Sequence, residues 1–206
     1  MGRIIITDLT RFQNAGIVCT AGTDVKSGAC IRPMPYLRTA DCVRLGILPG
    51  AILSGQFVPQ QGLVGPHQED ASYSGLKFVG ASSSEEFRKA LEAGLHKSVA
   101  AGFEITLQVG QKHVPADHPV QRSIITIKAD PSSIKIVEDR YNPGKVKIHF
   151  SDGSGHDFRF LSITDLGFHR YAQTHRAQSD LAHVNGFIKT TQTPPAQRTH
   201  LLRSEV

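Results

Sequence analysis

The sequence contains no tryptophan, only three cysteines and no long apolar run. Because no stretch approaches the roughly 18 apolar residues that a membrane-spanning helix needs, no transmembrane segment is predicted. The cysteines are Cys19, Cys30 and Cys42. Three cysteines cannot form a full disulfide framework, and no two of them have CxxC spacing, so a reducing cytoplasm is the favoured compartment. The glycine patterns of phosphate and dinucleotide loops and the serine-nucleophile elbow are also absent.

Histidine is frequent, with 10 in the chain, but no pair combines metal-ligand spacing with cysteine. The sequence therefore predicts no metal site, no cofactor and no catalytic residue. The net charge of +5 and the isoelectric point of 9.2 make polyanionic partners plausible without requiring them. Hydrophobic content of 39% and charged content of 20% are ordinary for a globular protein.

Short apolar runs separated by turn residues dominate the first half of the chain. A loop over 24–28 has Gly28 at its end, where a hairpin requires a positive φ. Gly55 interrupts a longer run and predicts a β-bulge, which is a usual way for a strand to bend around a small barrel. The strands expected in this half cover 4–6, 16–21, 30–33 and 51–58.

One helix is predicted near 84–95, because Ser83 precedes Glu86 at capping-box spacing and apolar residues follow at helical intervals. A proline-containing linker then leads into a second run of strands. We expect these strands at 123–128, 134–137, 145–150 and 158–163, with a turn at 151–155. The sequence thus predicts a mostly β protein of two small OB-like barrels in tandem with one or two inserted helices, over 1–113 and 120–206.

The tetrapeptide Ile-Thr-Asp-Leu occurs at 6–9 and again at 163–166, each time after an apolar run and before a basic and aromatic cluster. This repetition indicates two similar β-domains. Asp8 and Asp165 are interpreted as turn residues that accept hydrogen bonds from nearby backbone groups, in preference to catalytic carboxylates. The apolar ending at 201–206 is consistent with the start of a further strand, and hence with a second barrel that is incomplete or closed by a partner.

The segment Pro66-His67-Gln68-Glu69-Asp70 places one imidazole and two carboxylates within four residues. These side chains are of the types that ligate divalent ions or transfer protons. Adjacent carboxylates point in opposite directions on a strand, however, so a complete site needs ligands from elsewhere. The favoured interpretation is a loop in which Asp70 caps a turn, ahead of a metal or acid–base site. A third interpretation is a polar contact of His67 and Glu69 with a ligand base or ribose.

Cationic and aromatic residues supply the candidate binding surface, because single-stranded nucleic acids bind by phosphate neutralisation and by stacking of bases on rings. Arg32 lies in an otherwise apolar strand, so its guanidinium requires a carboxylate, a phosphate or solvent. The sequence allows an ion pair with Asp24 or Asp41, and equally a position in a binding groove shared with Arg38. Tyr36 and Tyr171 are the stacking candidates. The complete set is Arg11, Arg32, Tyr36, Arg38, His67, Glu69, Arg170 and Tyr171.

Several motifs occur in one order along the chain: Arg3-Ile4-Ile5-Ile6-Thr7-Asp8-Leu9-Thr10-Arg11, Val18-Cys19-Thr20-Ala21-Gly22, Cys30-Ile31-Arg32-Pro33, Pro66-His67-Gln68-Glu69-Asp70 and Ile163-Thr164-Asp165-Leu166. In this order they resemble the dual OB-containing domain family of prokaryotic proteins. The resemblance implies two OB-like barrels and, by analogy of fold, nucleic-acid or nucleotide binding. It lends no established activity to these positions.

The expected function is a cytoplasmic nucleic-acid-binding module, with single-stranded DNA or RNA favoured, acting within a bacterial defence or nucleic-acid-processing system. An enzyme is the first alternative, as a metal-dependent nuclease or nucleotide hydrolase that uses His67, Glu69 and Asp70. A protein-interaction subunit of a larger assembly is the second alternative. The expected partners are therefore a nucleic acid and, in the second alternative, another protein, with no membrane.

Overall fold

The computed structural model describes residues 1–12, 14–63, 65–115, 118–190 and 196–200. The chain divides into two compact units, Met1–Leu95 with Pro119–Ile124, and His96–His118 with Ile125–Val206. No helix in these ranges is long and apolar enough to cross a membrane. The predicted strand at 201–206 lies outside the described residues.

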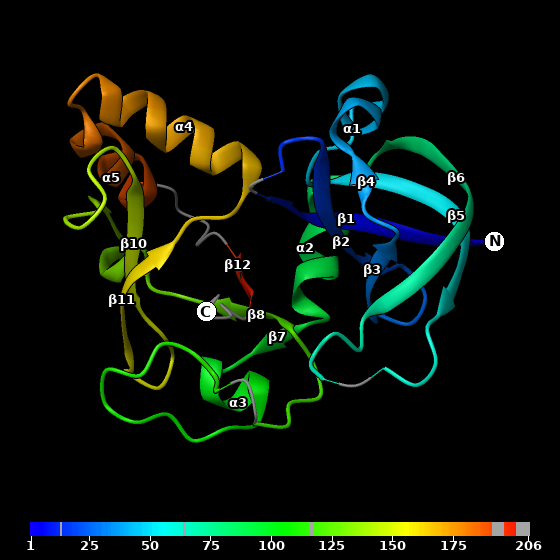
Figure 1. Ribbon diagram of the computed structural model, residues 1–206, viewed down its shortest axis with the longest axis horizontal. Coiled ribbons are helices and arrows are strands. Elements are labelled where there is room, and N and C mark those ends of the chain that lie inside the picture. Colours follow the sequence, from blue (N-terminus) through cyan, green and yellow to red (C-terminus); the bar gives the residue numbers. More distant parts are fainter. Residues whose placement is uncertain (13, 64, 116–117, 191–195, 201–206) are drawn as a thin grey trace. The chain divides into compact units, whose positions relative to one another are not determined.

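The first unit contains a closed, five-stranded mixed β-barrel (Figure 1). Each strand pairs with two others in the ring β1-β2-β3-β6-β5, and only the β3–β6 pair is parallel. A short strand, β4 (Leu37–Arg38), pairs with β2 outside this ring. The barrel strands are β1 (Gly2–Arg11), β2 (Ile17–Asp24), β3 (Cys30–Met34), β5 (Ala51–Pro59) and β6 (Asp70–Ala81).

Buried residues on β1 and β2 form the centre of the barrel. Ile4 to Leu9 are consecutively buried, since β1 faces the barrel interior on one side and α2 (Ser84–Glu92) contacts it as well. The pairing of β1 with β2 shifts at Thr7, where the strand carries one extra residue. Gly22 lies close to this bulge, and a Cβ there would approach the Ile5 carbonyl oxygen to 2.7 Å. The close approach of the two backbones at this point therefore requires glycine.

Local predictions for this unit agree with the structure in several places. Gly28 has a φ of 73° at the end of the β2–β3 loop. The β5–β6 register shifts at Gly55, but the extra residue lies on β6, where Gly75 and Leu76 together face Gly55, so the bulge is on the strand opposite the predicted one. Helix α2 begins after Ser83, whose side chain accepts a hydrogen bond from the Glu86 N–H while Glu86 accepts one from Ser83, completing the capping box. A second helix, α1 (Thr39–Leu45), lies between β4 and β5.

The remaining described chain forms two three-stranded sheets with helices, in the orders β11-β10-β9 and β12-β8-β7. Neither sheet closes, so the described residues contain one closed barrel and the second barrel remains an expectation. The fold is mixed α/β and not mostly β, because 166–190 form two helices that the sequence did not predict. The elements are β7 (Leu95–His96), α3 (Val99–Phe103), β8 (Ile124–Lys128), η1 (Pro131–Ser133), β9 (Lys135–Glu138), β10 (Val146–Ser151), β11 (Asp157–Ser162), α4 (Leu166–Ala177), α5 (Leu181–Thr190) and β12 (Ala196–His200).

Candidate nucleic-acid interface

A buried ion pair joins the parallel strands of the barrel. The register of β3 and β6 sets Arg32 directly opposite Asp70, and Arg32 Nε donates to Asp70 Oδ1 over 2.5 Å. Arg32 is 5% exposed and Asp70 is 8% exposed. Burial alone would lower the pKa of Arg32, but the hydrogen bond and the charge of Asp70 raise it. The guanidinium is therefore held charged inside the barrel by a partner that sequence reasoning did not identify.

Two further ionisable groups surround Arg32. Burial raises the pKa of Cys19 to about 11, although the charge of Arg32 opposes this rise. Burial likewise raises the pKa of Tyr36, again against the charge of Arg32. The thiol and the phenol thus both remain protonated at neutral pH. Cys19 is a small core residue here, while Tyr36 is only half-buried.

An aromatic pair marks the surface next to this cluster. Tyr36 follows the cis Met34–Pro35 peptide bond, and its ring lies 4.8 Å from the ring of Phe12, centroid to centroid, at an interplanar angle of 52°. Phe12 comes directly after the exposed Arg11 at the end of β1. Because both rings are only partly covered, each retains area on which a base can stack.

Two exposed arginines follow Tyr36. The side chains of Arg38 and Arg44 are 78% and 67% exposed, and both contact Asp41, at 3.1 and 3.2 Å. The hydrogen bond from Arg44, together with Arg38, lowers the pKa of Asp41. One carboxylate between two guanidinium groups leaves a net positive charge on this surface. We call the set Arg11, Phe12, Tyr36, Arg38 and Arg44 the arginine–tyrosine surface.

Backbone contacts fix the position of this surface on the barrel. Val18 of β2 pairs with Arg11 on one side and with Leu37 on the other. Thr39 Oγ1 donates to the Ala15 carbonyl over 2.6 Å, which ties the start of α1 to the β1–β2 loop. Arg11, Tyr36 and Arg38, predicted from the sequence, are thereby brought to one end of the barrel. Phe12, Asp41 and Arg44 were missed, although the i,i+3 spacing of Asp41 and Arg44 is a recognisable helix-pair signal.

The loop between β5 and β6 holds the predicted His67–Asp70 cluster. His67 is half-buried. Glu69 is buried and accepts hydrogen bonds from the Ser123 N–H, the Ser123 hydroxyl and the Ile124 N–H. Asp70 is engaged by Arg32, as described above. Both carboxylates therefore have protein partners, and no group of three or more metal-ligating side chains occurs in the described part of the chain.

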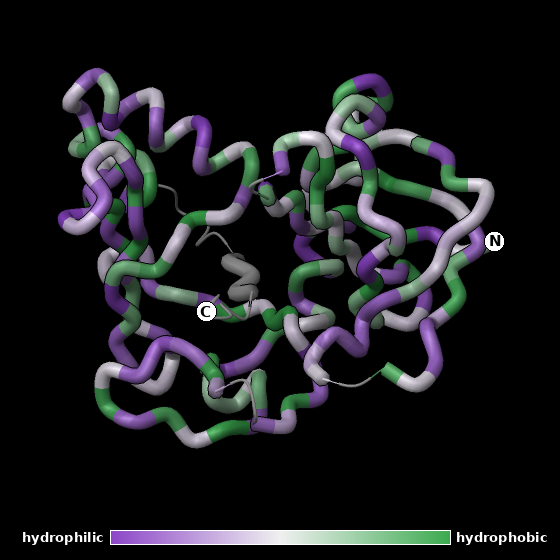
Figure 2. The backbone as a smooth tube through the Cα atoms, viewed as in Figure 1, coloured by the Kyte–Doolittle hydropathy of each residue, from purple (hydrophilic) through white to green (hydrophobic). Residues whose placement is uncertain are grey.

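Arg170 and Tyr171 lie on α4 in the second unit. Arg170 is exposed, whereas Tyr171 is half-buried among other rings. The Tyr171 ring lies 4.7 Å from the His175 ring and 6.1 Å from the Phe187 ring. Much of α4 is hydrophilic in Figure 2, in keeping with its composition. These two residues belong to the second unit, where they stay predicted contacts, and the arginine–tyrosine surface is made only of residues of the first unit.

Comparison of the chain with protein-family models, with curated proteins and with solved structures finds no match.

Proposed function

We propose that the barrel of the first unit is an OB-type barrel that binds single-stranded nucleic acid at the arginine–tyrosine surface. Its strand order, the parallel β3–β6 pair and the helix between the third and fourth barrel strands support this assignment. OB barrels bind oligonucleotides on the face of their second and third strands and on the flanking loops. Phe12, Tyr36 and Arg38 occupy the corresponding positions beside β2 and β3.

The observation that carries the proposal is the Phe12–Tyr36 ring pair beside two exposed guanidinium groups. Rings offer stacking to any base, and the arginines neutralise phosphates without reading sequence. The same arrangement fits a nuclease less well, since Glu69 and Asp70 are already engaged by Ser123 and Arg32. The expected ligand is single-stranded DNA or RNA.

The test is fluorescence anisotropy of labelled single-stranded DNA, single-stranded RNA and duplex DNA at about 50 and 200 mM salt. We expect a single strand to bind more tightly than duplex and to weaken as salt rises. Tyr36→Ala should weaken binding roughly tenfold, since stacking contributes about 1–3 kcal/mol per base. Arg38→Gln should flatten the salt dependence by about 0.7 in the logarithmic slope.

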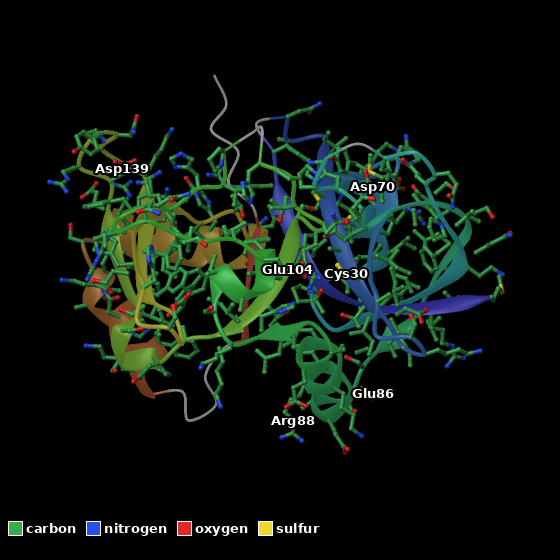
Figure 3. All side chains as sticks on the ribbon, turned by 90° about the horizontal axis from the view of Figure 1, so that it is seen from below. Cys30, Asp70, Glu86, Arg88, Glu104 and Asp139 are labelled. Atoms are coloured by element: carbon green, nitrogen blue, oxygen red, sulfur yellow. The ribbon has the colours of Figure 1, made fainter. Side chains whose placement is uncertain are left out.

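Arg88→Gln is the matched control, because Arg88 is an exposed arginine on α2 in the same unit (Figure 3). It carries the same charge change outside the proposed surface. Equal affinities for the Tyr36, Arg38 and Arg88 variants would contradict the assignment.

A further inference from the structure

The sheet β11-β10-β9 of the second unit has one apolar and one cationic set of residues. Along β10, buried residues alternate with half-buried ones, as expected for a sheet with two different faces. Helix α4 contacts β10 and α5 contacts β9. The alternate positions, which are not buried in this core, carry Lys135 on β9 directly opposite His149 on β10.

A β-bulge lies opposite His149. Ile148 pairs with Leu161 and Phe150 pairs with Phe158, so Arg159 and Phe160 together face the single residue His149. Phe160 takes a φ of 56°, in the left-handed region that a bulky side chain rarely adopts. Bulges of this kind redirect side chains near functional sites, and strained residues gather there. Here the bulge brings the Phe160 ring to 4.5 Å from the His149 ring.

Arg140 lies over two aromatic rings at the turn between β9 and β10. Its Cζ is 4.5 Å from the centroid of Phe160 and 5.3 Å from that of Tyr141. Tyr141 is 76% exposed. Asp139, labelled in Figure 3, accepts hydrogen bonds from the Tyr141 N–H and from Asn142 and so fixes the turn, which is largely hydrophilic in Figure 2. Arg140 forms no ion pair with a carboxylate of the described residues.

Positive charge accumulates around His149. Burial and the charges of four cations lower the pKa of His149; the cations are Arg159, Lys135, Arg140 and Lys112. Arg159 pairs with Asp157 over 2.6 Å, and Lys112 Nζ donates to the Arg159 carbonyl over 3.3 Å. Within the described chain, Lys112, Lys135 and Arg140 have no carboxylate partner. Like charges held together in this way repel each other unless an anion lies among them.

We propose that this surface is a second nucleic-acid contact site, in which Lys112, Lys135 and Arg140 bind phosphates and Tyr141 stacks on a base. The proposal rests on the single-strand binding proposed above and adds a site in the second unit. A nucleic acid is favoured over an acidic peptide because the cations alternate with rings. An exposed tyrosine, held beside a guanidinium by a fixed turn, provides the stacking platform that single strands use.

The test uses the full chain and the labelled single strand that binds best, with anisotropy measured over a range of salt. The double variant Lys135→Gln/Arg140→Gln should bind about tenfold more weakly and should reduce the logarithmic salt slope by about 1.4, or 0.7 per phosphate contact. Tyr141→Ala, a change at an exposed ring, should weaken binding roughly tenfold with little change in slope. Thermal melts establish that each variant is folded.

Lys128→Gln/Lys189→Gln is the matched control, because both lysines are exposed in the second unit and lie outside this sheet. Affinities of the Lys135/Arg140 and Tyr141 variants equal to that of the control would overturn the second site, whatever the Tyr36 and Arg38 variants show. Loss of binding only in the Lys135/Arg140 and Tyr141 variants would support it and overturn the arginine–tyrosine surface. No binding of any strand overturns both. A polyglutamate peptide is the competing ligand. If it bound the wild type more tightly than the oligonucleotide does, and if Lys135→Gln/Arg140→Gln abolished that binding, the nucleic-acid assignment would be overturned.

Discussion

Single buried carboxylates determine the conformation of several loops, and Asp152 is the clearest case. It follows β10 and is 6% exposed. Its Oδ1 accepts hydrogen bonds from the Ser154 N–H, the Ser154 hydroxyl and the His156 N–H, and its Oδ2 accepts one from the Val99 N–H. The composition of 151–155 predicted a turn here. The bond to Val99 could not be predicted, because it spans 53 residues of sequence.

Asp152→Asn should destabilise the protein by about 2 kcal/mol at pH 7, because the amide nitrogen cannot accept from the Val99 N–H. Burial alone would raise the pKa of Asp152, but these hydrogen bonds hold it below the usual range of an aspartate carboxyl. The stability from the charged form is thus complete above the unfolded pKa and is lost as pH falls through the lower folded pKa. Urea unfolding from pH 7 to pH 3 measures the free energies of unfolding of the wild type and of Asp152→Asn. We expect the two values to approach each other only in acid. The control Glu92→Gln, at an exposed site, should have the same dependence of unfolding free energy on pH as the wild type. If the unfolding free energies of Asp152→Asn and the wild type already agreed near neutral pH, this account would be contradicted.

At the scale of elements, the two Ile-Thr-Asp-Leu segments have different structures. In the first, Thr7 and Asp8 lie within β1 at its bulge, and Thr7 Oγ1 donates to Asp8 Oδ2 over 2.7 Å. In the second, Asp165 caps α4 and accepts from the Phe168 N–H over 2.6 Å. The turn-type role predicted for Asp165 is confirmed, but the two segments do not share a local structure, so the repeat itself gives no support for two similar domains. A short side-chain oxygen serves a strand or a helix end equally well, so four residues cannot distinguish them.

Strand β6 and helix α4 show why other elements escaped prediction. Most β6 residues from Ser72 onward are exposed or half-buried and many are polar, so the apolar alternation that identifies a strand is weak. Helix α4 places polar and aromatic residues along most of its length. Partners distant in sequence hold both elements in place. Elements with a strong apolar pattern, such as β1, were predictable because a run of apolar, β-branched residues favours a buried strand by itself.

The β3–β6 pair provides the test at this scale. Asp70→Asn should destabilise the protein by about 3–5 kcal/mol, because Arg32 would remain buried without its charged partner. Replacing both, as Arg32→Met/Asp70→Leu, should cost less than the single change, since no buried charge is left. Urea unfolding of the three proteins measures the difference. A single variant within about 1 kcal/mol of wild type would mean that the ion pair does not hold these strands.

At the scale of the whole molecule, the chain leaves the first unit after Leu95 and returns to it over Pro119–Ile124. Glu69 holds the returning segment by its bonds to Ser123 and Ile124. Sequence reasoning placed a linker near 114–119 and set the domain limits at 1–113 and 120–206, which stay a prediction. A return of this kind leaves no compositional trace, because it depends on one carboxylate, two backbone N–H groups and one serine hydroxyl.

Glu69→Ala should cost about 2–4 kcal/mol, since it leaves buried donors of Ser123 and Ile124 without an acceptor. Amide hydrogen exchange should accelerate most at Ser123 and Ile124. The control Glu85→Ala removes only an exposed pair with Lys89 and should change stability by less than about 0.5 kcal/mol. Unchanged protection at Ser123 would show that Glu69 does not hold the segment.

The return of 119–124 also sets an order of events during synthesis. Ribosomes add about 5–20 residues per second, so all five barrel strands have been made seconds before Ser123 exists. Glu69 precedes Ser123 by 54 residues, and in that interval its carboxylate lacks the donors of Ser123 and Ile124 that it has in the folded protein. A nascent chain halted after β6 should therefore carry a barrel with an unsecured β5–β6 loop. The first unit gains its last stabilising contacts only after 96–118 of the second unit have been translated.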